Sequence, residues 1–124
     1  MGGGRREGEL RAASRARVGL RWCIAIGWTV VVFTLLWMPV EGPQLYWWAD
    51  EATHFALFAG FGGGWRWVYQ ERPGRVIAAG LLVAAVTEGG QGLLPWPRTP
   101  AVDDLVLDVL GLLIGTAAAR WIRL

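Results

Sequence analysis

The order of apolar and polar residues divides the chain into a basic start and four apolar stretches. Nineteen residues from Trp22 to Val40 contain no charge, close to the ~20 that a helix needs to cross the hydrocarbon core of a bilayer. Three further apolar stretches carry charges inside or near their ends: Ala52 to Tyr69, Val76 to Leu94 and Leu105 to Ile122. Because no strand-like alternation is present, the pattern predicts an all-α polytopic membrane protein, a bundle of four transmembrane helices.

The first apolar stretch is expected to stay in the chain as a membrane anchor. A cleaved signal peptide has an apolar core of about 7 to 15 residues and small residues at its cleavage site. This core is longer, and Met38, Pro39, Val40 and Glu41 follow it. No lipid anchor is expected either, because Arg6 stands where N-myristoylation requires Ser or Thr.

The distribution of arginine predicts the orientation. If the N-terminus is cytoplasmic, eleven of the twelve arginines lie on the cytoplasmic side, as the positive-inside rule requires. The two outer loops, Glu41 to Glu51 and Pro95 to Asp103, then hold four acidic residues and one basic residue, Arg98. We therefore expect a multi-pass protein of the inner (plasma) membrane with both termini cytoplasmic. Its expected parts are a basic cytoplasmic segment, residues 1–21, and a four-helix transmembrane domain, residues 22–124.

Composition agrees with a membrane protein and removes several other classes. The 124 residues are too few for a multidomain enzyme, and a hydrophobic content of 54% excludes a disordered chain. Nine tryptophans, most of them at expected helix ends, suit interfacial anchoring, and eighteen glycines suit close helix packing. The basic start is interpreted as a topogenic segment that contacts anionic membrane lipid, so no nucleic-acid partner is expected. The single cysteine, Cys23, can form neither an intramolecular disulfide nor a metal knuckle.

Polar residues of three helices are expected at one depth, near the outer face. The second helix contributes Asp50 and His54, one turn apart. On the third helix, Glu88 lies roughly 9 Å below the outer end at 1.5 Å per residue, with Gln91 on the same face. The fourth helix adds two carboxylates one turn apart, and the loop before it adds a guanidinium. The candidate ligand-binding residues are Asp50, His54, Glu88, Gln91, Arg98, Asp104 and Asp108.

The acidic residues expected near the outer face have two roles. Asp50, Asp103 and Asp104 lie at helix starts, where a carboxylate caps free amides and meets the positive end of the helix dipole. Glu88 lies deeper, where an ionised carboxylate is costly without a partner. The economical partner is Arg98, folded back over the mouth of the bundle.

His54 admits three roles: proton acceptor, metal ligand or hydrogen-bonded packing residue. It is the only histidine of the chain, and a second soft ligand is missing, so no metal site and no cofactor are expected. The catalytic candidates are His54, Glu88 and Asp104. No Ser or Cys stands beside His54 as a nucleophile, and Thr53 and Thr99 are weak substitutes.

Glycines of the fourth helix predict close packing. Gly111 and Gly115 form a small-xxx-small step, which lets membrane helices approach each other closely. A phosphate-binding loop is not expected, because the chain contains neither Gly-Lys-Ser nor Gly-Lys-Thr.

The order and spacing of these residues resemble a known family. The segments Asp50-Glu-Ala-Thr-His54-Phe55, Glu88-Gly-Gly-Gln91 and Pro95-Trp-Pro-Arg98, then Asp104 and Asp108-Val-Leu-Gly111-Leu-Leu-Ile-Gly115, are similar to the recurring elements of the VanZ-like family of small bacterial integral membrane proteins. Two positions depart from the family's usual pattern, because Glu51 replaces Lys and Asp108 replaces Asn. The resemblance implies a protein of the bacterial cell envelope, in a family whose founding member is linked to resistance to the glycopeptide antibiotic teicoplanin.

Three classes of function fit the expected cluster. The first is a non-enzymatic membrane protein whose outward-facing pocket binds a lipid-linked cell-wall precursor or a lipidated compound such as a lipoglycopeptide. The alternative is a membrane-embedded hydrolase or transferase acting on a lipid-linked phosphate or acyl group, with His54 as acid or base and Arg98 clamping the anion. Proton-coupled export through Glu88 is the third, and it requires a homo-oligomer, because four helices without inverted repeats make a poor transporter. In the first class, Glu88, Arg98 and Asp104 form the charged core, which Asp50, His54 and Gln91 orient.

Overall fold

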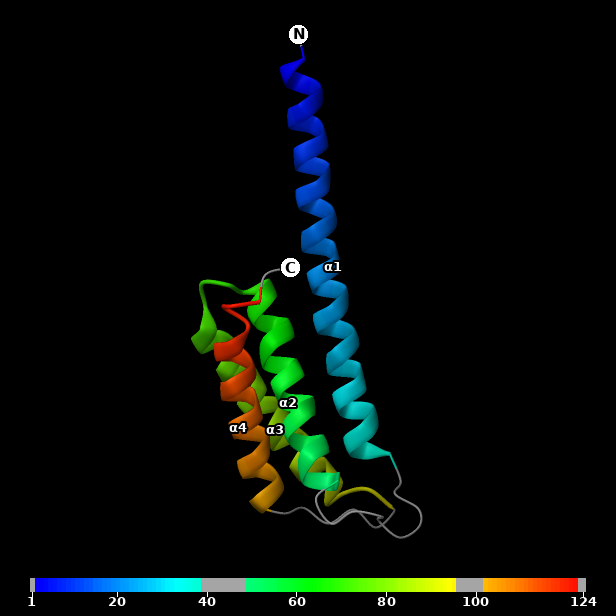
Figure 1. The fold of residues 1–124 in the computed structure, drawn as a ribbon. Helices are drawn as coiled ribbons and strands as arrows, with labels where there is room; N and C mark the ends of the chain where they lie inside the picture. The colour runs from blue at the N-terminus through cyan, green and yellow to red at the C-terminus, as the bar shows by residue number, and fades with distance from the viewer. Residues whose placement is uncertain (1, 39–48, 96–101, 123–124) are drawn as a thin grey trace.

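The fold is a bundle of four helices. The computed structural model describes residues 2–38, 49–95 and 102–122, which contain helices and no strand. The helices are α1 (Gly3–Trp37), α2 (Ala49–Val68), α3 (Pro73–Gln91) and α4 (Val102–Ala118). Consecutive helices run in opposite directions, so α2 and α4 start at the same end of the bundle (Figure 1). The predicted all-helical class is confirmed for the described residues.

Each later helix begins about one turn before the apolar stretch that predicted it. Asp50 and Glu51 lie in the first turn of α2, and two aspartates lie in the first turn of α4. Pro73 opens α3, because the amide that proline lacks would be unpaired at this position. Acidic residues and proline favour helix starts but interrupt an apolar run. An apolar count alone therefore sets the starts too late.

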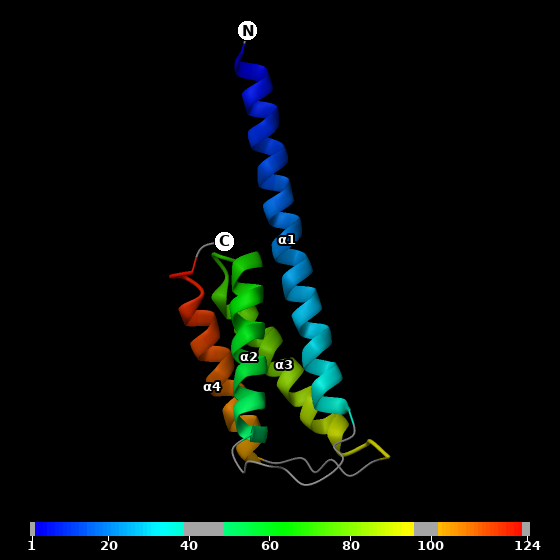
Figure 2. The ribbon, with the colours of Figure 1, turned by 45° about the vertical axis from the view of Figure 1, so that its right-hand side comes forward.

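The first helix is longer than the predicted span. It begins at Gly3, well before Trp22, and its 35 residues extend roughly 52 Å at 1.5 Å per residue. Residues 2–20 are exposed and project beyond the other helices, as Figure 1 and Figure 2 show. The predicted end of the span, Val40, lies outside the described residues. Within those residues, α1 is the one helix that is long and apolar enough to cross a membrane.

The core joins all four helices. Phe58 of α2 is fully buried and belongs to one cluster with Val32 and Leu36 of α1, Ala84 of α3 and Leu112 of α4. The closest association is between α2 and α4, which lie side by side in both ribbon views. Because each helix contributes to the same cluster, the core fixes how the helices pack against one another.

Two indole groups of α1 bind the neighbouring helices. Trp28 Nε1 donates to a main-chain carbonyl oxygen of α2 at 2.7 Å, and Trp37 Nε1 donates to one of α3 at 3.1 Å. Gly60 and Gly90 leave room for the two rings, since a methyl group at either position would overlap the indole. Tryptophan is expected as an interfacial anchor, so this hydrogen bonding between helices is an additional role.

Candidate functional site

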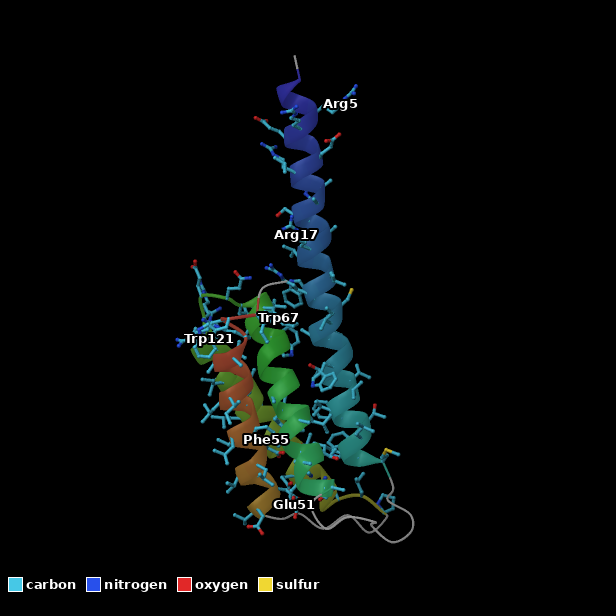
Figure 3. The ribbon with its side chains drawn as sticks, viewed as in Figure 1. Arg5, Arg17, Glu51, Phe55, Trp67 and Trp121 are labelled. Carbon is cyan, nitrogen blue, oxygen red and sulfur yellow. The ribbon has the colours of Figure 1, made fainter. Side chains whose placement is uncertain are left out.

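The close contact of α2 with α4 positions the polar residues. A methyl group at Gly111 would overlap the carbonyl oxygen of Phe55, and one at Gly115 would overlap that of Ala59. The predicted small-xxx-small packing is therefore confirmed. Figure 3 shows Glu51 and Phe55 near the end of the bundle where both helices start. The first turns of α2 and α4 consequently place their acidic residues in one region.

His54 and Asp108 form a buried pair across these two helices. His54 Nδ1 lies 2.7 Å from Asp108 Oδ1, and the two residues are 1% and 0% exposed. Because a carboxylate oxygen only accepts, we assign a proton to Nδ1, which donates it to Asp108. This bond fixes the orientation of the imidazole and directs Nε2 away from Asp108.

Asp104 and Asp50 face the remaining part of the imidazole. Asp104 Oδ2 lies 3.6 Å from His54 Nε2, and one donor atom from each of Asp50, His54 and Asp104 lies within 4.8 Å of the others. Both aspartates are in the first turn of their helices, where the positive end of the helix dipole stabilises a carboxylate. Their expected position at helix starts is confirmed, and the capping of free amides stays a prediction.

The third helix contributes Glu88 to the same region. Glu88 is 8% exposed, and one of its oxygens lies within 4.8 Å of donor atoms of His54 and Asp108. Since both groups contain His54, five of the seven candidate residues meet in one place. We refer to these five as the His54 cluster: Asp50, His54, Glu88, Asp104 and Asp108.

The other two candidates have different positions. Gln91 is buried, and its Nε2 donates to the Leu36 carbonyl oxygen at 2.9 Å. This bond ties the end of α3 to the end of α1. Arg98 lies outside the described residues, and so does its expected pairing with Glu88. The weak nucleophile candidate Thr99 lies outside them as well.

The His54–Asp108 contact is the feature that sequence reasoning missed. The prediction paired Glu88 with Arg98 and treated Asp108 only as a further carboxylate. A usable signal was present, because Asp108, Gly111 and Gly115 follow the i, i+3, i+7 spacing of one helix face. The face that packs closely on α2 therefore carries Asp108 with it.

The described part of the cluster favours a positively charged group. It holds four carboxylates and one imidazole, and Asp108 Oδ2 is buried with no hydrogen-bond partner among the described residues. With Nδ1 donating to Asp108, Nε2 faces an acidic oxygen and can carry a second proton, bind a cation or accept a hydrogen bond. The described groups therefore have the chemistry to bind a cation or a strong hydrogen-bond donor.

The same donors could hold a divalent metal ion. Asp50, His54 and Asp104 offer one imidazole nitrogen and two carboxylate oxygens, and Asp108 would support the histidine from its other ring nitrogen, as carboxylates commonly do at metal sites. Ligand atoms of a tetrahedral zinc site lie about 3.4 Å apart when each bond is about 2.1 Å, close to the 3.6 Å between Nε2 and Asp104. The spacing of these residues in the sequence does not indicate a metal site, whereas their donor atoms in the structure lie close enough together to hold an ion. The expectation of no metal stays a prediction.

Comparison with known proteins identifies the family. A family model described as VanZ/LLP1 matches residues 15–123, which include the whole His54 cluster. Neither the curated proteins nor the solved structures contain a match to this chain. Because the match covers most of the sequence, the chain belongs to the VanZ-like family.

Proposed function

We propose that the protein crosses the inner membrane four times, with both termini in the cytoplasm. Family membership and the apolar helix α1 support a membrane location. Further crossings are supported by Leu82 on α3 and by Val106 and Ile114 on α4, which are each more than half exposed and would contact lipid tails. The described N-terminal and C-terminal parts lie at one end of the bundle (Figure 1), and the His54 cluster lies at the other.

The function that we propose is binding of the polar part of a lipid-linked or lipidated envelope compound at the outer end. The observation that carries this proposal is the convergence of three helices on His54, which lies 2.7 Å from Asp108 and 3.6 Å from Asp104. Ionisable groups within a membrane bundle are costly and usually serve a function. A lipoglycopeptide such as teicoplanin is one ligand of the proposed class, and resistance to it is one proposed outcome.

The charge of the described cluster indicates which group of the ligand it would hold. Carboxylates predominate among the described residues of the cluster, and a carboxylate attracts an amino group but repels a phosphate. A phosphate would require the guanidinium of Arg98, which lies outside the described residues. We therefore expect the ligand to present an amine to the partly exposed Asp104, beside the buried Asp108, while its apolar part stays in the bilayer.

Replacement of each of two neighbouring aspartates by asparagine tests the proposal. Asp104→Asn removes a carboxylate that lies 3.6 Å from His54, whereas Asp103→Asn removes an exposed carboxylate from the same helix turn. The protein is purified in mild detergent, and its organic extract is analysed by mass spectrometry. We expect amine-bearing envelope compounds to copurify with the wild type and with Asp103→Asn, and to fall about tenfold with Asp104→Asn.

Equal recovery of the same compounds from both variants, at equal protein abundance, would contradict binding at the cluster. Metal analysis of the same preparations separates an ion from an amine as the positive group. If one ion is bound per chain and is lost only in Asp104→Asn, the positive group at the cluster is a metal ion and not an amine.

A second candidate function is membrane-embedded hydrolysis or group transfer. The specific observation in its favour is the His54–Asp108 pair, because a buried aspartate that orients a histidine is typical of general acid–base catalysis. Turnover discriminates the two functions. A product formed from envelope lipids by the purified protein, and lost in His54→Gln, would establish an enzyme.

A further inference from the structure

A cavity lined by arginines lies at the end of the bundle opposite the His54 cluster. Its volume is about 630 Å³, and it is bounded by the end of α2, the middle of α1 and the residues that follow α4. Figure 3 shows Arg17, Trp67 and Trp121 at this end. We refer to it as the arginine cavity; its arginines are Arg17, Arg21, Arg66 and Arg120.

The arginine cavity concentrates positive charge. No acidic residue is among the described residues that line it. Because four guanidinium groups line one cavity, their positive potentials add there. In addition, Arg66 Nη1 is buried and has no hydrogen-bond partner among the described residues. Both features indicate a place for an anion.

One wall of the cavity is held in position by specific contacts. Trp67 Nε1 donates to the Ile122 carbonyl oxygen at 2.9 Å, which fixes the segment after α4 against α2. The Arg120 guanidinium lies 4.3 Å from the centre of the Trp121 ring, a distance suited to a cation–π interaction. The residues after α4 are therefore attached to the bundle as part of this wall.

An apolar groove continues from the arginine cavity. It has a volume of about 320 Å³ and shares Trp67, Ala119 and Ile122 with the cavity. Its other lining residues include Ile24 and several glycines of α2, so it follows the seam between α1, α2 and α4. Charged residues are absent from the described residues that line it. A ligand that fills both spaces has an anionic head and an apolar tail.

We propose that the arginine cavity and its groove bind one anionic phospholipid. The phosphate contacts Arg66 and Arg120, and an acyl chain lies in the groove beside Ile24. Arginine binds phosphate oxygens through several directed hydrogen bonds, and anionic lipids are enriched beside the basic ends of membrane proteins. A free phosphate would match the cavity but not the groove. This inference is independent of what the His54 cluster binds.

Native mass spectrometry of the full chain in detergent tests the proposal. The probes are phosphatidylglycerol, phosphatidylcholine and inorganic phosphate, added separately. We expect phosphatidylglycerol to be retained about tenfold better than phosphatidylcholine, and millimolar inorganic phosphate to leave it bound. Loss of one cationic contact in Arg66→Gln or Arg120→Gln should lower retention of phosphatidylglycerol about fivefold. Arg5→Gln, which removes the same charge from an exposed position far from the cavity, should leave it unchanged.

Filling the groove separates the lipid from a free anion. A Cβ atom at Gly63 would lie 3.6 Å from the Gly115 carbonyl oxygen, which is an ordinary contact, so Gly63→Leu occupies the groove while all four arginines remain. Its control is Gly27→Leu, at an exposed position with no atom within 4 Å. We expect only Gly63→Leu to lower retention of phosphatidylglycerol. Equal retention of the two lipids, equal loss in Arg5→Gln and Arg120→Gln, or displacement of the lipid by phosphate would each overturn the proposal.

Discussion

At the scale of single residues, the arrangement of the outer end depends on one buried hydrogen bond. His54 and Asp108 are almost completely inaccessible to solvent, so water cannot replace either partner when the other is removed. An unsatisfied buried donor costs about 1–3 kcal/mol. Asparagine keeps an acceptor oxygen in the place of the aspartate but carries no charge. Substitution at this position can therefore separate hydrogen bonding from charge.

Asp108→Ala and Asp108→Asn should differ in stability. We expect Asp108→Ala to lower the free energy of unfolding by about 1–3 kcal/mol, because His54 Nδ1 loses its acceptor. Asp108→Asn should retain most of the stability but bind less of an amine ligand. Unfolding in mild detergent and the copurification analysis measure the two effects separately. If both variants unfold alike, the His54–Asp108 hydrogen bond does not contribute the expected stability.

The sequence was enough to choose the residues of the cluster but not to pair them. Helix depth grouped His54 with Glu88, Asp104 and Asp108, because depth follows from residue count along each span. Pairing depends on how each helix is rotated about its axis, which the contact of Gly115 with Ala59 sets in α4. Which side chains of that face meet could therefore be determined only from the packed helices.

At the scale of helices, glycine determines how closely α2 and α4 approach. Gly62 of α2 also has α4 as its neighbour, since a Cβ atom there would lie 2.6 Å from the Leu112 carbonyl oxygen. The tight pairing of small residues was predictable from the fourth helix alone. The extent of α1 was not, because an apolar window ignores the charged residues after Gly3. Many residues of this basic start are alanine, arginine and glutamate, which are good helix formers.

Gly115→Ala and Gly89→Ala form a matched pair on two helices. A methyl group at Gly115 overlaps main-chain atoms of Ala59, whereas no atom lies within 4 Å of one at Gly89. We expect Gly115→Ala to destabilise the bundle by about 1–3 kcal/mol, as overpacking does. Gly89→Ala should be neutral or stabilising by up to about 1 kcal/mol, because alanine is the better helix former. Thermal unfolding in detergent is the measurement, and equal melting temperatures would contradict close packing of α2 on α4.

At the scale of the whole molecule, the two ends of the bundle carry opposite charge. The His54 cluster gathers carboxylates where α2 and α4 start, and the arginine cavity gathers guanidinium groups where the same helices end. The positive-inside rule assigns the second end to the cytoplasm. An outward-facing acidic site is accessible to envelope compounds, whereas an inward-facing one is not. The proposed binding of envelope compounds therefore depends on this orientation of the bundle.

Cysteine labelling in intact cells tests this orientation directly. Cys23→Ser first removes the exposed native thiol, and a single cysteine is then placed by Asp103→Cys or by Gln70→Cys, both at exposed positions at opposite ends of the bundle. We expect a membrane-impermeant maleimide to label Asp103→Cys in intact cells, and to label Gln70→Cys only after the membrane is permeabilised. Labelling of Gln70→Cys in intact cells, with Asp103→Cys protected, would place the His54 cluster in the cytoplasm and contradict the proposed orientation.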